Sequence, residues 1–280
     1  MTGLQAPSPA IDFVSRGNVG PALLFVPGSY STAAAWRGVW AHLPADWRLV
    51  ATSLLGCGET AETRRPADAD MAHELAVVQA AVARMGGGPV HLVGHSFGGT
   101  VALAAALDKT VEVASLALFE ANPFDLIAGN RSVYGAARDL AAEFAKALQA
   151  GDSDAAGRII DYWGGAGCFA AMPPRVQEFC RRTAPANALD WETCLGFRPD
   201  PQAIAALDCP ILLVRGEAAI PAMVAITQAL GAVLPAARRE EVAGAGHFLI
   251  STHPEHCAAL LVEHLARTKA APAAEKWSPT

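Results

Sequence analysis

The sequence predicts an α/β fold with a mostly parallel, doubly wound sheet and an inserted helical cap. Short runs of β-branched residues and leucine alternate with longer alanine-rich segments of helical period, the pattern of parallel strands joined by helices. This alternation stops over residues 122–198, which are helical and aromatic without a convincing buried strand. The chain has 280 residues, enough for one large core that carries such an insertion. We therefore expect a core of residues 1–121 and 199–268, a helical cap of residues 122–198 and a flexible tail of residues 269–280.

The expected elements follow one another in the order that a doubly wound sheet requires. Leu75, Val78, Val82 and Met85 recur at spacings of three and four, which marks the buried stripe of a helix that feeds the third strand. A short segment, residues 11–15, is expected to add one antiparallel strand before the others. The candidate parallel strands are Ala22–Val26, Arg48–Ser53, Val90–Gly94, Ala114–Glu120, Pro210–Arg215 and Arg238–Val242.

Composition excludes several classes of function. The chain is 52% hydrophobic and 17% charged, yet no apolar run approaches the about 20 residues that span a bilayer. The first 20 residues lack the features of a secretory signal, so we expect a cytoplasmic protein without a membrane partner. A net charge of -6 without a basic run argues against nucleic acid. The six cysteines form no CxxC pair, which argues against a zinc site. We expect neither a metal nor another cofactor. The expected partner is a small-molecule substrate. A homodimer is left open.

The chemistry is indicated by the segment VHLVGHSFGGT, residues 90–100. It places Gly94-His95-Ser96-Phe97-Gly98 directly after an apolar strand and directly before a helical run. A tight turn between a strand and a helix lifts its central residue into a cleft, and flanking glycines avoid collisions with nearby backbone. The backbone N–H of Phe97 opens the helix and can point at an oxyanion. These features predict that Ser96 is a nucleophile.

From this motif onward the sequence resembles the α/β-hydrolase fold family over roughly residues 10–267. The segment LLFVPGSYSTAAAW, from Leu23, is similar to the family's strand followed by His-Gly-x, with Pro27 standing where His is usual. The resemblance implies that the Ser29 N–H is the second oxyanion donor. The segment ATSLLGCGET is similar to the family's P-D-x-x-G-x-G-x-S loop, although Ser53 and Cys57 replace its usual Asp and His.

A histidine stands where this family keeps its general base. His247 follows the expected last strand in the segment Gly244-Ala245-Gly246-His247. A serine hydroxyl is a poor nucleophile at neutral pH and needs an imidazole to take its proton and return it to the leaving group. We assign this role to His247. The neighbouring His95 is expected to be a packing residue.

The acid that orients this histidine is harder to identify. In the family it most often lies three residues after the position of Gly216, where this chain has Ala219. Some members carry it one strand earlier, and there the segment SLALFEANPF offers Glu120, a lone carboxylate at an apolar strand end. We therefore expect Glu120 to be the acid. Glu217, Asp125 or no acid at all are the alternatives.

These residues predict a serine hydrolase that forms an acyl-enzyme on Ser96 from a small hydrophobic or aromatic carboxylic ester or lactone. Two rivals stay open: the same fold running another reaction (carbon-carbon bond hydrolase, lyase, acyltransferase or cofactor-free oxygenase), and a ligand-sensing protein with little turnover. A nucleotide-binding Rossmann domain is disfavoured because the first strand lacks G-x-G-x-x-G. The side chains that we expect near an apolar pocket are Tyr30, Trp36, Phe124, Trp163 and Phe169.

Overall fold

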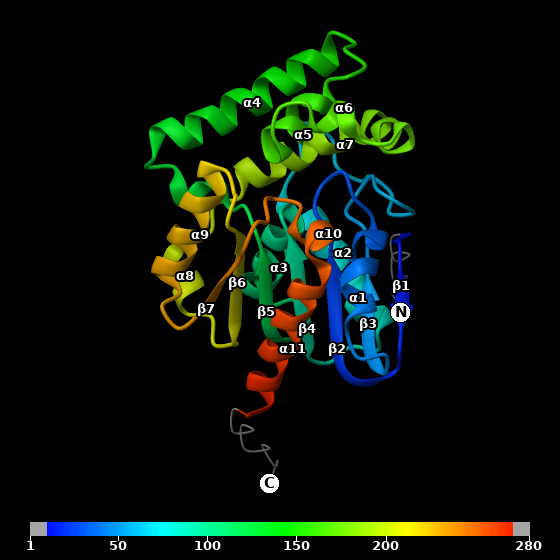
Figure 1. The fold of residues 1–280 in the computed structure, drawn as a ribbon, viewed down its shortest axis with the longest axis vertical. Coiled ribbons are helices and arrows are strands. Elements are labelled where there is room, and N and C mark those ends of the chain that lie inside the picture. Colours follow the sequence, from blue (N-terminus) through cyan, green and yellow to red (C-terminus); the bar gives the residue numbers. More distant parts are fainter. Residues whose placement is uncertain (1–9, 271–280) are drawn as a thin grey trace, which may run out of the picture.

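The computed structural model describes residues 10–270, and a seven-stranded sheet lies at their centre (Figure 1). The strand order is β1-β3-β2-β4-β5-β6-β7, with β1 antiparallel to β3 and every other neighbouring pair parallel. The strands are β1 (Val14–Arg16), β2 (Val19–Val26), β3 (Trp47–Ala51), β4 (Val90–His95), β5 (Val113–Phe119), β6 (Ile211–Gly216) and β7 (Arg238–Val242). The predicted fold class is confirmed, including the antiparallel first strand. The largest differences in strand bounds are three residues, at the start of β1, expected at residue 11 and observed at Val14, and at the start of β2, expected at Ala22 and observed at Val19.

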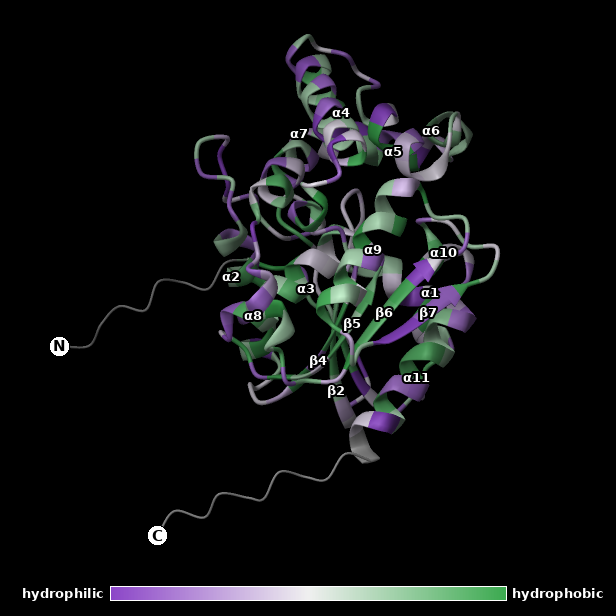
Figure 2. Ribbon diagram, turned by 90° about the vertical axis from the view of Figure 1, so that its left-hand side faces the viewer, coloured by the Kyte–Doolittle hydropathy of each residue, from purple (hydrophilic) through white to green (hydrophobic). Residues whose placement is uncertain are grey.

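Helices cover both faces of the sheet. Successive side chains of a strand point to opposite faces, and in β2 the side chains of Leu23 and Phe25 join one buried hydrophobic cluster while those of Leu24 and Val26 join the other. One face is covered by η1 (Ala33–Trp36), α1 (Arg37–Ala41), α10 (Leu249–Thr252) and α11 (Pro254–Ala270), and the other by α2 (Met71–Arg84), α3 (Phe97–Asp108), α8 (Pro201–Ala205) and α9 (Pro221–Val233). Burial on both faces explains why the central strands are mostly apolar, as Figure 2 shows in green.

The segment between β5 and β6 is helical, and all of its helices except α8 gather beyond one end of the sheet (Figure 1). They are η2 (Phe124–Ile127), α4 (Arg131–Gln149), α5 (Ala156–Gly164), α6 (Cys168–Ala171) and α7 (Pro174–Gly196). We call η2 and α4–α7 the insertion. No helix in residues 10–270, α7 included, has the length and apolar character needed to cross a membrane. The expected tail at residues 269–280 starts inside α11, which runs to Ala270, and the rest of that segment lies outside the described residues.

Candidate active site

Ser96 lies on the sharp turn between β4 and α3, with φ of 53° and ψ of −126°. A positive φ is uncommon for a residue with a side chain and indicates a strained turn. Backbone passes close by on both sides: a Cβ on Gly94 would lie 2.4 Å from the carbonyl oxygen of Gly98, and a Cβ on Gly98 would lie 2.1 Å from that of Pro27. Only glycine fits at these two positions. The G-x-S-x-G spacing is therefore a packing requirement of the turn that displays Ser96.

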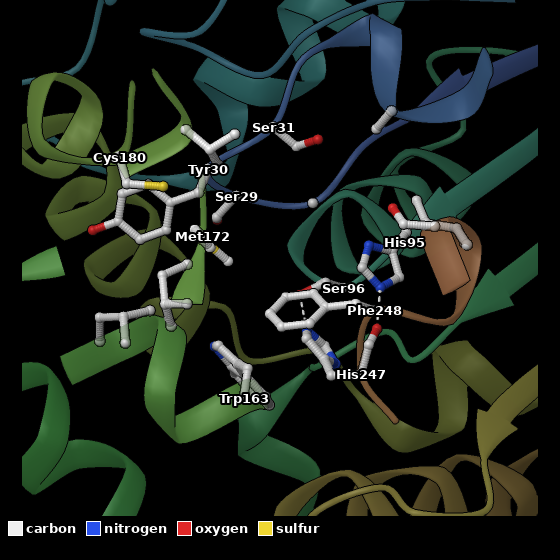
Figure 3. A pocket seen from close by; sticks show the side chains of 17 residues that line it. Ser29, Tyr30, Ser31, His95, Ser96, Trp163, Met172, Cys180, His247 and Phe248 are labelled. Atoms are coloured by element: carbon white, nitrogen blue, oxygen red, sulfur yellow. Dashed lines mark hydrogen bonds between the residues drawn. The ribbon is translucent and has the colours of Figure 1, made fainter. Parts of the chain in front are cut away.

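Ser96, His247 and Glu120 form one hydrogen-bonded chain. His247 Nε2 lies 3.0 Å from Ser96 Oγ (Figure 3), and His247 Nδ1 lies 2.6 Å from Glu120 Oε2. An ionised carboxylate only accepts hydrogen bonds, so Nδ1–H donates to Glu120 and Nε2 is left to accept from the serine hydroxyl. The three side chains follow β4, β5 and β7, and the carboxyl ends of these parallel strands meet at one edge of the sheet. All three are buried.

Glu120 is held by backbone as well as by the histidine. Its φ is 47°, its Oε1 accepts the N–H of Gly216 at 2.8 Å, and the residue is 1% exposed. Glu217 is exposed, and its Oε2 accepts the N–H of Gly244 at 2.7 Å. Asp125 is paired with Arg198. Of the three carboxylates considered from the sequence, only Glu120 lies against the imidazole.

His95 supports the loop that carries His247. Its Nε2 lies 2.8 Å from the carbonyl oxygen of His247, so an Nε2–H donates there (Figure 3). Burial lowers the pKa of His95 to about 3, and the neighbouring His247 acts in the same direction. The ring is therefore neutral at physiological pH. Its contact is with the backbone of His247, in agreement with a packing role.

The two amides expected to bind an oxyanion flank the nucleophile. The N–H of Phe97 opens α3 and is one of the four amides that have no acceptor within their own helix. Ser29 lies in the loop after β2, where a Cβ on the preceding Gly28 would lie 3.0 Å from the Cβ of Ser96. The Ser29 hydroxyl donates to Asp190 Oδ2 at 2.7 Å, which ties this loop to α7 of the insertion.

An aromatic stack leads from the imidazole into the insertion. The ring of Trp163, on α5, lies over His247 with centroids 4.2 Å apart and planes 20° apart. Trp191, on α7, stacks on Trp163 at 6.0 Å, and Phe124 stacks on Trp191 at 5.5 Å. Trp163 thus forms part of the wall around the histidine, and the stack orients that wall.

A large chamber of about 260 Å³ opens at Ser96. Its lining is mostly apolar and includes Tyr30, Ile160, Met172, Val176 and Phe248, besides Trp163 and His247 (Figure 3). Burial raises the pKa of Tyr30 well above its usual value, and its hydroxyl has no hydrogen-bond partner among residues 10–270. The phenol therefore stays neutral.

A small chamber of about 20 Å³ lies on another side of Ser96. Ser29, Ser96 and Trp163 line both chambers. The remaining wall of the small chamber is more polar and consists of Phe97, Asn122, Phe124, Asn187, Asp190, Trp191 and Cys194. His247 lines the large chamber and does not line the small one.

The expected pocket set is corrected at two positions. Tyr30 and Trp163 line the large chamber and Phe124 lines the small one, whereas Trp36 and Phe169 line neither. Trp36 is fully buried on the face covered by α1 and α11, packed against Phe25 with ring centroids 5.1 Å apart. Phe169 packs within the insertion, where a Cβ on Gly157 would lie 3.1 Å from its ring. Both side chains pack in the hydrophobic interior.

Sequence analysis missed the residues that α7 contributes. Asn187, Asp190, Trp191 and Cys194 recur at spacings of three, four and seven, so they share one face of this helix. All four are buried. Polar side chains on a buried helical face at this spacing are the signal that would have indicated a wall of a site.

Behind the small chamber, one buried arginine faces three carboxylates. The Arg64 side chain has no exposed area, and its Nη atoms lie 2.8 Å from Glu62 Oε2, 3.2 Å from Glu74 Oε1 and 2.9 Å from Asp190 Oδ1. Burial raises the pKa of Glu74 to about 8, against the opposing charge of Arg64. We call Arg64, Glu62, Glu74 and Asp190 the arginine cluster. It joins the loop after β3, α2 and α7, and so connects the core with the insertion.

Within residues 10–270, no group of three or more His, Cys, Asp or Glu side chains is arranged to hold a metal ion.

Known proteins with the same architecture include several α/β-hydrolases. The chain is similar to MenH from S. aureus (16% identity, 93% of this chain and 99% of that one, TM-score 0.72) and to an esterase from Thermogutta terrifontis (22% identity, 95% and 96%, TM-score 0.72). It is also similar to Est816, described as an N-acyl homoserine lactone degrading enzyme (18% identity, 92% and 98%, TM-score 0.69). No curated protein sequence matches significantly. At these identities the solved structures establish the fold.

The family assignment is based on the sequence itself. A profile of the Alpha/beta hydrolase family matches residues 23–260, which span the elements from β2 to α11 and include Ser96, Glu120 and His247. The resemblance noted from the sequence motifs is thereby confirmed. This chain belongs to the alpha/beta hydrolase family.

Proposed function

We propose that this protein is a serine hydrolase that cleaves a small hydrophobic or aromatic carboxylic ester or lactone. The observation that carries the proposal is the hydrogen-bonded chain from Ser96 Oγ through His247 to Glu120 at the mouth of an apolar chamber. Such a chain activates a hydroxyl, because the imidazole takes its proton as the oxygen attacks and the carboxylate stabilises the resulting cation.

The reaction proceeds in two halves. Ser96 Oγ attacks the carbonyl carbon, its proton passes to His247 Nε2, and the amides of Phe97 and Ser29 bind the developing oxyanion. The tetrahedral intermediate then breaks the bond to the alcohol, which leaves with the proton from Nε2. A water molecule attacks the acyl-enzyme in the same way, giving its proton to Nε2. The free acid departs as Ser96 regains a proton.

The test is a panel of apolar esters, lactones and thioesters assayed with the native protein and with Ser96→Ala. We expect turnover by the native protein and a loss of roughly a thousandfold or more in the variant, since only binding and oxyanion stabilisation are left. Ser153→Ala, an exposed position between α4 and α5, is the matched control and should keep native activity.

Product analysis separates hydrolysis from the other reactions of this fold. A free acid formed in water, with a transient mass increase on Ser96 equal to the acyl group, supports the proposal. Native-rate turnover by Ser96→Ala would reject it. Tight binding of a panel member with no turnover by the native protein would favour a ligand sensor, and transfer of the acyl group to a second substrate without net hydrolysis would favour an acyltransferase.

A further inference from the structure

The small chamber fits the carbonyl oxygen of a substrate. Phe97 and Ser29, whose amides are the two expected oxyanion donors, line it together with Ser96. Its volume of about 20 Å³ is close to the roughly 10–15 Å³ that one water-sized group occupies. A single oxygen atom fits such a space, so the two substituents of the carbonyl carbon lie outside it. The residues around this chamber therefore decide how well an oxyanion is stabilised.

A carboxylate of the insertion shares this chamber with the two amides. Asp190, on α7, lines the small chamber and is 3% exposed. Its Oδ2 accepts the Ser29 hydroxyl at 2.7 Å, and Arg64 Nη2 lies 2.9 Å from its Oδ1. Asp190 therefore connects the loop after β2, which carries an oxyanion donor, with the buried arginine after β3.

A carboxylate beside an oxyanion needs a counter-charge. Two negative charges in one small buried space repel each other, and the low dielectric of the interior strengthens the repulsion. Burial raises the pKa of Asp190, and the positive charge of Arg64 acts in the opposite direction. The Arg64 side chain has no exposed area, so this charge is not screened by solvent. Arg64 thus allows Asp190 to accept a hydrogen bond here without strongly opposing the reaction.

The loop that carries the Ser29 amide has strained backbone. Tyr30, the next residue, has φ of 54°, in the left-handed region that bulky side chains rarely adopt. Such a conformation persists only where the surrounding structure holds it. The hydrogen bond between the Ser29 hydroxyl and Asp190 holds the loop one residue before the strained point. This position matters because a hydrogen bond from the Ser29 N–H weakens steeply when its angle or distance departs from the optimum.

We infer that Asp190 is a positioning residue of the oxyanion site: by accepting the Ser29 hydroxyl, it fixes the Ser29 N–H in the direction of the developing oxyanion. This role rests on the proposed function, since an oxyanion forms only if Ser96 attacks a carbonyl carbon. Asp190 acts on the reaction through Ser29. The insertion therefore contributes to the chemical step as well as to the walls of the chambers.

Three substitutions test this role, each measured as kcat and KM on an ester that the native protein cleaves. Ser29→Ala removes the hydroxyl and keeps the amide. Asp190→Leu removes the acceptor at a similar shape. Asp190→Asn keeps a hydrogen bond, since its Nδ2–H can donate to the Ser29 oxygen while its Oδ1 stays with Arg64. The matched controls are Thr32→Val, in the same loop but lining neither chamber, and Glu192→Gln, an exposed position of α7.

We expect kcat and kcat/KM to fall together, roughly tenfold to hundredfold, in Ser29→Ala and in Asp190→Leu, with KM near its native value. A displaced amide stabilises the oxyanion less and leaves substrate binding unchanged. Asp190→Asn and both controls should stay within a few-fold of the native kcat. In the double variant Ser29→Ala/Asp190→Leu, the loss should equal that of Ser29→Ala alone, because the hydroxyl through which Asp190 acts is already absent.

A transition-state analogue distinguishes positioning from a general loss of structure. When phenylboronic acid adds to Ser96 Oγ, boron gains a fourth bond to oxygen and a negative charge, and His247 takes the serine proton. The inhibition constant of phenylboronic acid should rise in Ser29→Ala by about the factor by which kcat/KM falls. Benzyl alcohol forms no oxyanion, so its inhibition constant should be the same in the native protein and in Ser29→Ala.

The outcomes separate this role from the proposed function. Turnover that is lost in Ser96→Ala but stays native in Ser29→Ala overturns the role of Asp190 and leaves the proposed function standing, whether or not Asp190→Leu folds. Losses that multiply in the double variant also overturn the role, since Asp190 would then act independently of Ser29. A loss confined to KM, or an equal loss in Thr32→Val, does the same. If the native protein cleaves no ester, the proposed function is rejected, and the inference with it.

Discussion

Two of the buried groups of polar side chains in residues 10–270 differ in how completely their hydrogen bonds are satisfied. In the chain of Ser96, His247 and Glu120, both imidazole nitrogens and both carboxylate oxygens have partners between 2.6 and 3.0 Å away. In the arginine cluster, one cation faces three carboxylates, and the adjacent Asn187 has no hydrogen-bond partner within residues 10–270.

The difference reflects what each group is attached to. The first chain is built on the ends of three parallel strands, and its geometry is therefore set by a rigid sheet. The arginine cluster spans the contact between the core and α7. Complete pairing suits a site whose chemistry needs fixed geometry, whereas the arginine cluster, with the unpaired amide of Asn187 beside it, holds the insertion against the core.

The largest effect is expected from breaking the satisfied chain at its acid. Glu120→Gln keeps the shape of the side chain but removes the charge that orients His247 and stabilises its cation, so kcat should fall roughly a hundredfold to ten-thousandfold. Glu217→Gln is the matched control, since its side chain accepts a backbone N–H on the surface, and it should stay within a few-fold of the native rate. Equal losses in the two variants would contradict the assignment of the acid.

The second effect is on stability and concerns the arginine cluster. Arg64→Met should lower the free energy of unfolding by about 3–5 kcal/mol, because three carboxylates lose their common buried partner. Arg158→Met removes an exposed pair with Asp152 and should cost less than about 1 kcal/mol. Urea unfolding of both variants measures the difference. If Arg64→Met were no more destabilising than Arg158→Met, the cluster would not stabilise the contact between core and insertion.

The third effect is a change in the pH dependence of stability. The pKa of Glu74 is raised from 4.5 to about 8 in the folded state, so the folded protein binds this proton more tightly than the unfolded chain does. Between pH 4.5 and about 8 this group therefore makes the native protein less stable as pH rises, by up to about 1.4 kcal/mol per pH unit.

Glu74→Gln removes that titration. The free energy of unfolding of Glu74→Gln, measured relative to the native protein by urea titration at several pH values, should therefore increase from pH 5 to pH 8. A difference that is constant over this window would show that Glu74 titrates alike in the folded and unfolded states. The contribution of His95 to stability has the opposite sign, because its lowered pKa makes the folded state less stable as pH falls below 6.5. Both proteins contain His95, so this contribution cancels in the difference between them.

The order of strands, the elbow at Ser96 and the placement of His247 after the last strand were predictable because each is recorded in a short stretch of sequence. The glycine two residues before Ser96 reports a contact within that turn, and the glycine two residues after it reports a contact with the end of β2. Glu120 was less predictable, because the sequence offers Glu217 as well. Glu120 lies 127 positions before His247 and Glu217 lies 30 positions before it, and only the folded chain shows which carboxylate reaches the imidazole. Trp36 was misplaced because its aromatic character is the same whether it lines a chamber or, as observed, packs beneath the sheet.

The sequence by itself determined the fold class and the residue types at the ends of the strands, since hydrophobic period and turn chemistry act between near neighbours in the chain. The tertiary structure alone decided which side chains form the two chambers. Ser29 and Asp190 are 161 positions apart and meet at 2.7 Å, and this contact brings α7 over Ser96. Contacts of this kind depend on how whole helices pack, and no local pattern specifies that packing.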